Sequence, residues 1–310
     1  MKQLQEPCMR SIKNLALLIF SAALALSAAS EGLACTLWGA AGGKTENGGT
    51  IIAKNRDWEP TQIQDLKKVL PLEGFRYLGL FATDGGGTGL KAGVNEKGLA
   101  VVTATASTIP RSKRSGKDAD SISSPEILKS CASVDDVLAM LDRFCNADFY
   151  LVADKTKVAV IEVAPGKRAV ARVTHNGALA QTNHYQESTL SRMNRKVSAS
   201  SQVRYERILE LLSEEGNGLS LEDFIAFSED REAGPDNSIW RTGGSPARTR
   251  TLATWIFENP ANGLPPSLYL KIANPDQPQK TMRLVLDANF WEPRPRGDKA
   301  AETGEEKPIA

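Results

Sequence analysis

The chain has 310 residues, of which 41% are hydrophobic and 24% are charged, which is an ordinary balance for a globular protein. Its formal net charge is +1. The sequence has neither a basic excess nor aromatic residues interleaved with basic ones, and this argues against binding to nucleic acid.

The first 34 residues have the order of a secretory signal peptide. Basic residues precede an apolar run over 15–26, and small residues at Gly32 and Ala34 follow it. This order predicts cleavage after Ala34, so that Cys35 begins an exported protein, periplasmic or secreted. The apolar run is too short to span a bilayer, and no membrane span is predicted. Met9 is an alternative start that keeps a working signal peptide.

The rest of the chain alternates runs of strands with runs of helices. Helices are predicted to begin at Ser124, where Pro125 follows in the first turn, and at Ser133, which opens a capping box with Asp136. A further helix is predicted over 203–212, and strands over 50–54, 99–105, 149–153, 158–163, 169–173, 178–182, 267–272 and 282–286. The order lacks the regular rhythm of a doubly wound sheet, so it predicts an α+β fold with largely antiparallel sheets.

The domain boundaries follow from the two ends of the chain. Residues 293–310 are Pro-rich and charged and carry no apolar pattern, which predicts a disordered tail. The signal peptide over 1–34 and this tail leave 35–292 as the folded domain.

Cysteine and histidine usage limits the chemistry. Cys131 and Cys145 could pair in an oxidising compartment, but their spacing leaves that pairing open. His175 and His184 are the only histidines, so the sequence does not predict a Cys/His zinc site or any other metal site.

An N-terminal cysteine can supply both a nucleophile and a base. Cleavage after Ala34 would give Cys35 both a thiol and an α-amine. An α-amine titrates near pH 7.7–8.0, so its neutral form can take the proton of the attacking thiol, and one residue supplies nucleophile and base. The alternatives are a disulfide half or a lipidated cysteine. Gly32 stands where lipoprotein cleavage sites prefer Leu, which speaks against a lipid-anchored envelope binding protein.

Several short motifs in order resemble the N-terminal-nucleophile (Ntn) cysteine hydrolases. The resemblance is to the branch with choloylglycine hydrolases, penicillin V acylases and acyl-CoA:6-aminopenicillanate acyltransferases. The motifs are Cys35-Thr36, the segment 49–58 (GTIIAKNRDW), the turn 93–100 (GVNEKGLA), the segment 182–185 (TNHY) and the run 245–250 (SPARTR).

The resemblance implies roles for residues around the thiol. Asp57 would hold the Cys35 amine. Lys54 falls where the family usually has a catalytic Arg, and Arg56 could substitute, so the cation beside the thiol stays open. Either positive charge would favour a thiolate. Trp58 follows as a pocket residue.

The later motifs imply the remaining site residues. Asn95, within the turn, and Asn183 would steady the oxyanion and the substrate, the kind of donor that affects rates by about 10²–10³. His184 is expected to line the pocket or pack rather than act as a base. Arg248 is the expected late arginine, with Arg250 as the alternative in another register.

The fold implied by the resemblance is a four-layer αββα Ntn-hydrolase sandwich. The implied activity is cleavage or transfer of the acyl group of a small-molecule amide through a thioester on Cys35, with no cofactor. A dipeptidase of the related Cys-Thr type is the alternative enzyme. The sequence leaves the oligomeric state open.

Overall fold

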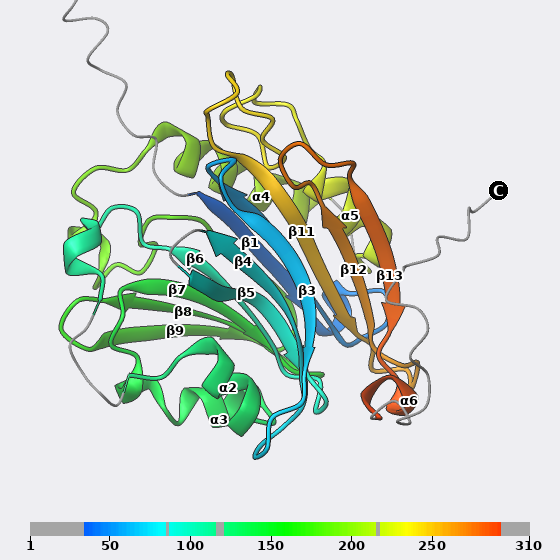
Figure 1. The fold of residues 1–310 in the computed structure, drawn as a ribbon. Helices are drawn as coiled ribbons and strands as arrows, with labels where there is room; N and C mark the ends of the chain where they lie inside the picture. The colour runs from blue at the N-terminus through cyan, green and yellow to red at the C-terminus, as the bar shows by residue number, and fades with distance from the viewer. Residues whose placement is uncertain (1–33, 85–86, 116–120, 215–217, 293–310) are drawn as a thin grey trace, which may run out of the picture.

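The fold was analysed in a computed structural model, which describes residues 34–84, 87–115, 121–214 and 218–292. The predicted signal peptide, apart from Ala34, and the predicted tail over 293–310 lie outside the described residues. Figure 1 shows two large sheets stacked face to face with helices on the outside.

The first sheet has six strands in the order β10-β1-β2-β11-β12-β13. All of its neighbouring strands are antiparallel. Its strands are β1 (Cys35–Ala41), β2 (Thr50–Trp58), β10 (Gly177–Gln181), β11 (Arg250–Asn259), β12 (Ser267–Ile272) and β13 (Lys280–Val285). The order brings the first two strands to the middle of the sheet, between segments from the later part of the chain.

The second sheet has seven strands that follow one another in chain order, each antiparallel to the next. They are β3 (Ile63–Val69), β4 (Tyr77–Asp84), β5 (Gly87–Asn95), β6 (Ala100–Thr105), β7 (Asp148–Ala153), β8 (Val158–Ala164) and β9 (Arg168–Thr174). The strands predicted over 149–153 and 158–163 are confirmed as β7 and β8, which pair with each other in antiparallel fashion.

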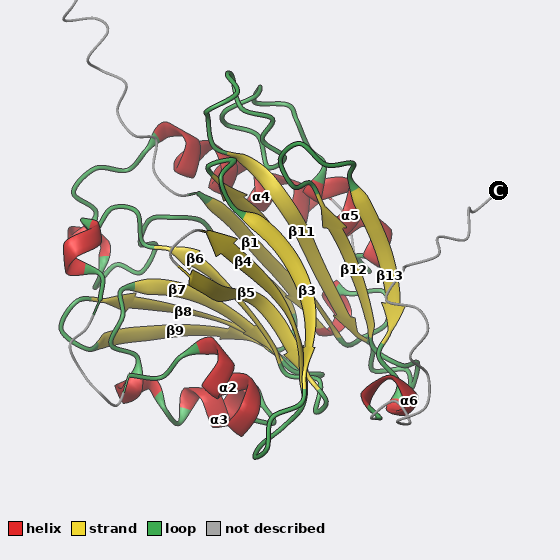
Figure 2. Ribbon diagram, in the orientation of Figure 1, coloured by secondary structure: helices red, strands yellow, loops and turns green. Residues whose placement is uncertain are grey.

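Helices cover the outer face of each sheet (Figure 2). The second sheet packs on α2 (Ser124–Ser130) and α3 (Val134–Leu138), and the first sheet packs on α4 (Ala199–Glu214) and α5 (Leu221–Ser228). A short helix, α6 (Ala288–Trp291), ends the described chain. The layers therefore run helix, sheet, sheet, helix, and the four-layer α+β prediction is confirmed.

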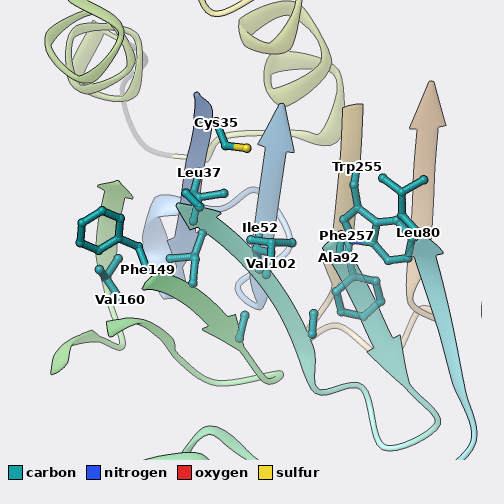
Figure 3. Close-up of a cluster of buried hydrophobic side chains, with 14 of the residues drawn as sticks. Cys35, Leu37, Ile52, Leu80, Ala92, Val102, Phe149, Val160, Trp255 and Phe257 are labelled. Carbon is teal, nitrogen blue, oxygen red and sulfur yellow. The ribbon is translucent and has the colours of Figure 1, made fainter. Parts of the chain in front are cut away.

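The main core lies between the two sheets. Leu37 of β1, Ile52 of β2, Val102 of β6 and Phe149 of β7 all belong to it, as Figure 3 shows. Cys35 lies at one end of this cluster, on the same face of β1 as Leu37. The apolar interior therefore continues up to the thiol.

Strand β2 carries different chemistry on its two faces because successive side chains of a strand point to opposite sides. Ile52 faces the other sheet, and so Lys54 and Arg56 do as well. On the helix-facing side, Asn55 donates hydrogen bonds to the backbone oxygens of Ser228 and Ile239, at 2.7 and 2.9 Å. Asp57 shares that side with Asn55. The charged residues of the motif are thus divided between two compartments.

The two predicted helix starts are confirmed. Ser133 accepts a hydrogen bond from the backbone N–H of Asp136, whose carboxylate caps the N–H of Ser133 in return. Ser123 and Glu126 make the equivalent box one helix earlier. These side chains satisfy backbone groups that the first turn leaves without intrahelical partners.

Two further observations bear on the expectations above. Cys131 and Cys145 do not form a disulfide. Over the described parts of the chain, no helix is long and apolar enough to cross a membrane.

Candidate active site

Cys35 begins the central strand β1. Its side chain is buried and its register partner on β2 is Arg56. Its backbone N–H donates to Oδ1 of Asn183 at 2.9 Å. The backbone nitrogen that would become the α-amine is therefore already held by a side chain 148 positions away in sequence.

The cation beside the thiol is Arg56. Its Nη1 lies 3.8 Å from Sγ of Cys35. The guanidinium also donates to the backbone oxygen of Asp57 at 3.1 Å and to Oε1 of Gln62 at 2.7 Å. It stacks on the ring of Trp58 at 3.9 Å. Burial lowers the pKa of Arg56, while the nearby charge of Cys35 opposes that shift. These contacts fix the guanidinium against the sulfur.

Lys54 lies on the same face of β2 but is directed into the second sheet. Its Nζ donates to the backbone oxygens of Lys91 on β5 and Thr103 on β6, at 2.8 and 2.5 Å. Burial lowers the pKa of Lys54 to about 8, and the charge of Cys35 opposes the shift. Of the two cations that the sequence left open, Arg56 therefore contacts the thiol, whereas Lys54 ties the two sheets together next to it.

Asp57 lies in the helix-facing compartment. One carboxylate oxygen, Oδ1, accepts a hydrogen bond from the hydroxyl of Thr251 at 2.8 Å. The other, Oδ2, is buried and has no hydrogen-bond partner among the described residues. Burial raises the pKa of Asp57, and the charges of Arg204 and Arg241 oppose that shift. Since Asp57 follows the register partner of Cys35, it lies opposite residue 34, at the peptide bond whose cleavage was predicted.

Arg204, on α4, was not anticipated from the sequence. Its Nη1 donates to the backbone oxygen of Cys35 and to Oγ1 of Thr36, both at 2.8 Å, and its Nη2 donates to Oδ1 of Asn183 at 3.0 Å. It is fully buried and lies four residues before Ile208 on the apolar face of the helix. A charge on the buried face of an amphipathic helix implies a buried polar partner, and this pattern is the sequence signal that could have found it.

Asn183 joins Cys35 to the second sheet. Its Oδ1 accepts from Cys35 and Arg204, and its Nδ2 donates to the backbone oxygen of Thr105 at 2.9 Å. Its own N–H donates to Oγ of Ser201 at 3.0 Å. The structure thus brings Asn183 to the thiol residue, with both polar atoms of its side chain engaged.

His184 makes its ring contacts with residues other than Cys35. Its Nδ1 lies 2.8 Å from Oγ of Ser201, its Nε2 lies 2.6 Å from Nε2 of Gln186, and its ring packs edge-on against Tyr205. Burial lowers the pKa of His184 to about 4, so the imidazole is neutral at ordinary pH. These contacts are those of a packing residue.

Asn95 does not lie at the thiol, which corrects the role expected for it. Its Nδ2 donates to the backbone oxygens of Leu128 and Cys131, at 2.9 and 2.8 Å, and its Oδ1 accepts from the N–H groups of Lys97 and Leu99. Both amide hydrogens are therefore used to hold the end of α2. The turn motif fits because Asn favours such local bonds, and its role here is structural.

The late arginines lie in and next to the loop before β11. Arg248 is half-buried in the loop before β11, and its N–H donates to the backbone oxygen of Ser245. The alternative, Arg250, donates to the backbone oxygen of Pro246. Arg241 is the fully buried arginine whose charge acts on Asp57. Arg241, which was not anticipated from the sequence, therefore acts on Asp57, and the role expected for Arg248 stays a prediction.

A pocket of about 270 Å³ opens beside these residues. Its lining includes Trp58, Thr105 and Asp148 together with Arg111 and Arg114. Burial raises the pKa of Asp148 to about 7, against the opposing charge of Lys54. No group of three or more His, Cys, Asp or Glu side chains that could hold a metal ion was found in the described parts of the chain.

Comparison with known proteins now identifies the family. The family model described as acyl-coenzyme A:6-aminopenicillanic acid acyl-transferase matches residues 44–265, more than two thirds of the chain. The chain belongs to this family. Its members are Ntn-type enzymes that transfer or hydrolyse acyl groups, and the recognition made from the motifs is confirmed. The match begins after Cys35, so the assignment of the nucleophile depends on the site geometry.

The structural comparisons add distant likenesses. A mutant of the conjugated bile acid hydrolase from Clostridium perfringens is 13% identical, with a TM-score of 0.44 over 82% of this chain and 93% of that one. An N-acylethanolamine-hydrolyzing acid amidase orthologue from Caenorhabditis elegans is 15% identical, with a TM-score of 0.48 over 74% of this chain and 94% of that one. A search of curated proteins found no match.

Proposed function

We propose that the mature protein is an exported N-terminal cysteine acylase. In this account the signal peptide is removed after Ala34, Cys35 becomes the first residue, and the enzyme breaks the C–N bond of a small amide through a thioester on Cys35. No cofactor takes part in the proposed reaction.

The observation that carries the proposal is the surroundings of the Cys35 backbone nitrogen. In the uncleaved chain this nitrogen has one hydrogen, which goes to Asn183. Asp57, opposite residue 34, keeps a buried carboxylate oxygen with no partner among the described residues. A buried acceptor without a donor costs about 1–3 kcal/mol. Cleavage would create an ammonium with further hydrogens and a positive charge at this point, which supplies what Asp57 lacks.

The proposed reaction proceeds in two halves. The neutral α-amine of Cys35 takes the thiol proton, and Sγ attacks the carbonyl carbon of the amide. The C–N bond then breaks, the amine returns the proton to the leaving nitrogen, and a thioester remains on Sγ. Water, or an acceptor amine, attacks the thioester carbon in the second half while the α-amine again takes the proton. The carboxylic acid or new amide departs and the thiol is restored.

The other residues have proposed roles that match their contacts. Arg56 stabilises a thiolate at Sγ by attraction of opposite charges. Asp57 and Asn183 hold the α-amine in the orientation in which its lone pair reaches the thiol proton. Arg204 fixes the backbone of Cys35 and neutralises Asp57. All four are buried, where a fixed charge is worth more than in water.

The proposal is tested with three forms of the protein: one that begins at Cys35, one that keeps Ala34 in front of it, and Cys35→Ala. They are assayed on a panel of N-acyl amides and a panel of dipeptides. The account expects activity on acyl amides from the first form alone. Full activity in a form shown by mass to keep Ala34 would contradict the α-amine as base, and preference for dipeptides would favour the dipeptidase alternative.

A further inference from the structure

The pocket of about 270 Å³ beside Cys35 has positively charged residues in its lining. Two arginines contribute to its lining, Arg111 and Arg114, both from the loop that follows β6. The volume of about 270 Å³ is at the lower end of small-molecule sites. It suits a group the size of an amino acid or a short acyl chain.

The pocket adjoins the thiol through three of its walls. The ring of Trp58 stacks on the guanidinium of Arg56, which contacts Sγ of Cys35. Thr105 accepts the hydrogen bond of Asn183, which in turn holds the Cys35 nitrogen. Asp148, the register partner of Thr105, acts electrostatically on Lys54. A group that occupies this pocket would therefore belong to a substrate whose carbonyl is at Sγ.

Hydrogen bonds to backbone groups hold the loop that contains Arg111 and Arg114 in place. Nε of Arg114 donates to the backbone oxygen of Ile109 at 2.7 Å. The backbone oxygen of Arg114 accepts from the N–H of Ala147 at 2.7 Å, which ties the loop to the start of β7. Nε is thus engaged, while the two terminal nitrogens of Arg114 make no ion pair within the described residues. A pre-organised arginine such as Arg114 suits a planar carboxylate.

The positive charge of the pocket is not cancelled by Asp148, the one acidic residue in its described lining. Asp148 faces Lys54 and Lys91 as well as Arg114, so its single charge is shared among several cations. Burial lowers the pKa of Arg114, with Asp148 opposing that shift. Arg111 is exposed at the rim. Among the described residues, the charge at the mouth of the pocket is therefore positive.

We infer that this pocket selects substrates that carry a carboxylate, which Arg111 and Arg114 receive while the scissile amide lies at Cys35. The inference rests on the proposed function, since it takes Cys35 as the reacting group. It names the substrate class as acidic amides, such as N-acyl amino acids, in preference to neutral ones.

Two alkylating agents of similar size test this without knowledge of the substrate. Iodoacetate is anionic and iodoacetamide is neutral, and both transfer a carbon to a thiolate with loss of iodide. The rates at Cys35 are followed by peptide mass in the form that begins at Cys35. The ratio of the two rates, divided by that for the neutral thiol 2-mercaptoethanol, cancels the reactivity of the thiol and isolates the attraction of the anion.

The variants are Arg114→Gln, Arg111→Gln and the control Lys113→Gln. Lys113 lies between the arginines but lines a different pocket, so the control removes the same charge from the same loop. The ratio is expected to fall by about tenfold in Arg114→Gln and severalfold in Arg111→Gln, within the range of charged clefts, and to stay unchanged in Lys113→Gln. The contribution of Arg56 is common to all forms and cancels.

The outcomes separate the two claims. A lower ratio in the arginine variants alone supports the carboxylate pocket. Ready labelling of Cys35 by iodoacetamide, with a ratio that no arginine variant changes, would overturn the pocket and leave the proposed nucleophile in place. Failure of both reagents to label Cys35 would overturn the proposed function and this inference with it.

Discussion

Nη1 of Arg56 lies 3.8 Å from Sγ of Cys35, and the two residues are register partners on adjacent central strands. The strand pairing thus fixes the cation beside the sulfur, and Gln62 and Trp58 hold its side chain in place. The thiol has a charged neighbour that does not depend on a flexible loop.

Replacement of Arg56 tests this neighbour. Arg56→Gln removes the charge at Sγ, so kcat/KM is expected to fall by about 10²-fold, the scale of one charged donor at a reaction centre. Arg56→Lys keeps the charge but loses the fork to Gln62 and the stack on Trp58, so it should recover part of that loss. Steady-state kinetics on the processed enzyme provide the measurement. Equal activity of Arg56→Gln and wild type would refute the role.

Asp57→Asn tests the partner of the α-amine. The substitution keeps the shape but removes the charge, so the amine is no longer held and kcat should fall by about 10²–10⁴-fold. It also removes the negative charge on which Arg204 and Arg241 act, so a lower free energy of unfolding should accompany the loss. Thr251→Val is the control: it removes the hydroxyl that donates to Oδ1 and accepts from the backbone N–H of Arg241 but keeps the charge of Asp57, so it should cost far less activity. A folded Asp57→Asn enzyme with near-normal kcat would contradict the assignment.

Substitutions of Asn95 and Asn183 should have different effects, the first on stability and the second on kcat. Asn95→Ala removes bonds to four backbone groups of the turn and of α2, so the free energy of unfolding should fall by about 2–4 kcal/mol, with kcat unchanged in the folded protein. Asn183→Ala should instead lower kcat, because it releases the Cys35 nitrogen. Chemical denaturation and kinetics on both variants provide the test. A stable Asn95→Ala protein with a kcat lowered about 10²-fold would restore the oxyanion role.

The free energy of unfolding should depend on pH because Asp148 titrates differently in the folded and unfolded states. Its pKa is raised to about 7 in the folded state from an ordinary value of 3.8, so between these values the folded state binds more protons than the unfolded one. The contribution of Asp148 to stability is therefore lost as the pH rises from about 4 to about 7.

Asp148→Asn lacks this titration. Relative to wild type, the variant should gain about 1–3 kcal/mol in free energy of unfolding across that pH window. Lys54 remains charged up to a pH of about 8, so it adds no change within the window. Urea denaturation at several pH values measures the difference. A difference between the two proteins that does not vary with pH would count against the raised pKa.

The parts of the fold that the sequence predicted are those with local causes. The capping box of Ser133 and the apolar run of β8 (VAVIEVA, every residue buried) can be recognised within a few residues. Strand β3 escaped prediction because its exposed Ile63 and buried Gln64 reverse the usual pattern. Strand β5 escaped because its three glycines resemble a loop.

The candidate site was predicted from short motifs. Cys35 and Asn183 were found in this way, and the structure joins them. The motif around Asn95 was read correctly as a turn, but its chemistry was misplaced, because a turn that precedes a strand does not tell which end of the sandwich it occupies. Arg204 and Arg241 reach the site through the packing of α4 and of the loop before β11, at sequence separations over which no local pattern extends.

The central claim is that Cys35 becomes the N-terminal residue, and one measurement addresses it most directly. The protein is recovered from its native export compartment, and its intact mass and N-terminal sequence are determined. The account predicts a chain that starts at an unmodified Cys35, with an α-amine able to meet Asp57. A chain that starts at another residue, or a Cys35 that carries lipid, would remove the proposed base and contradict the account.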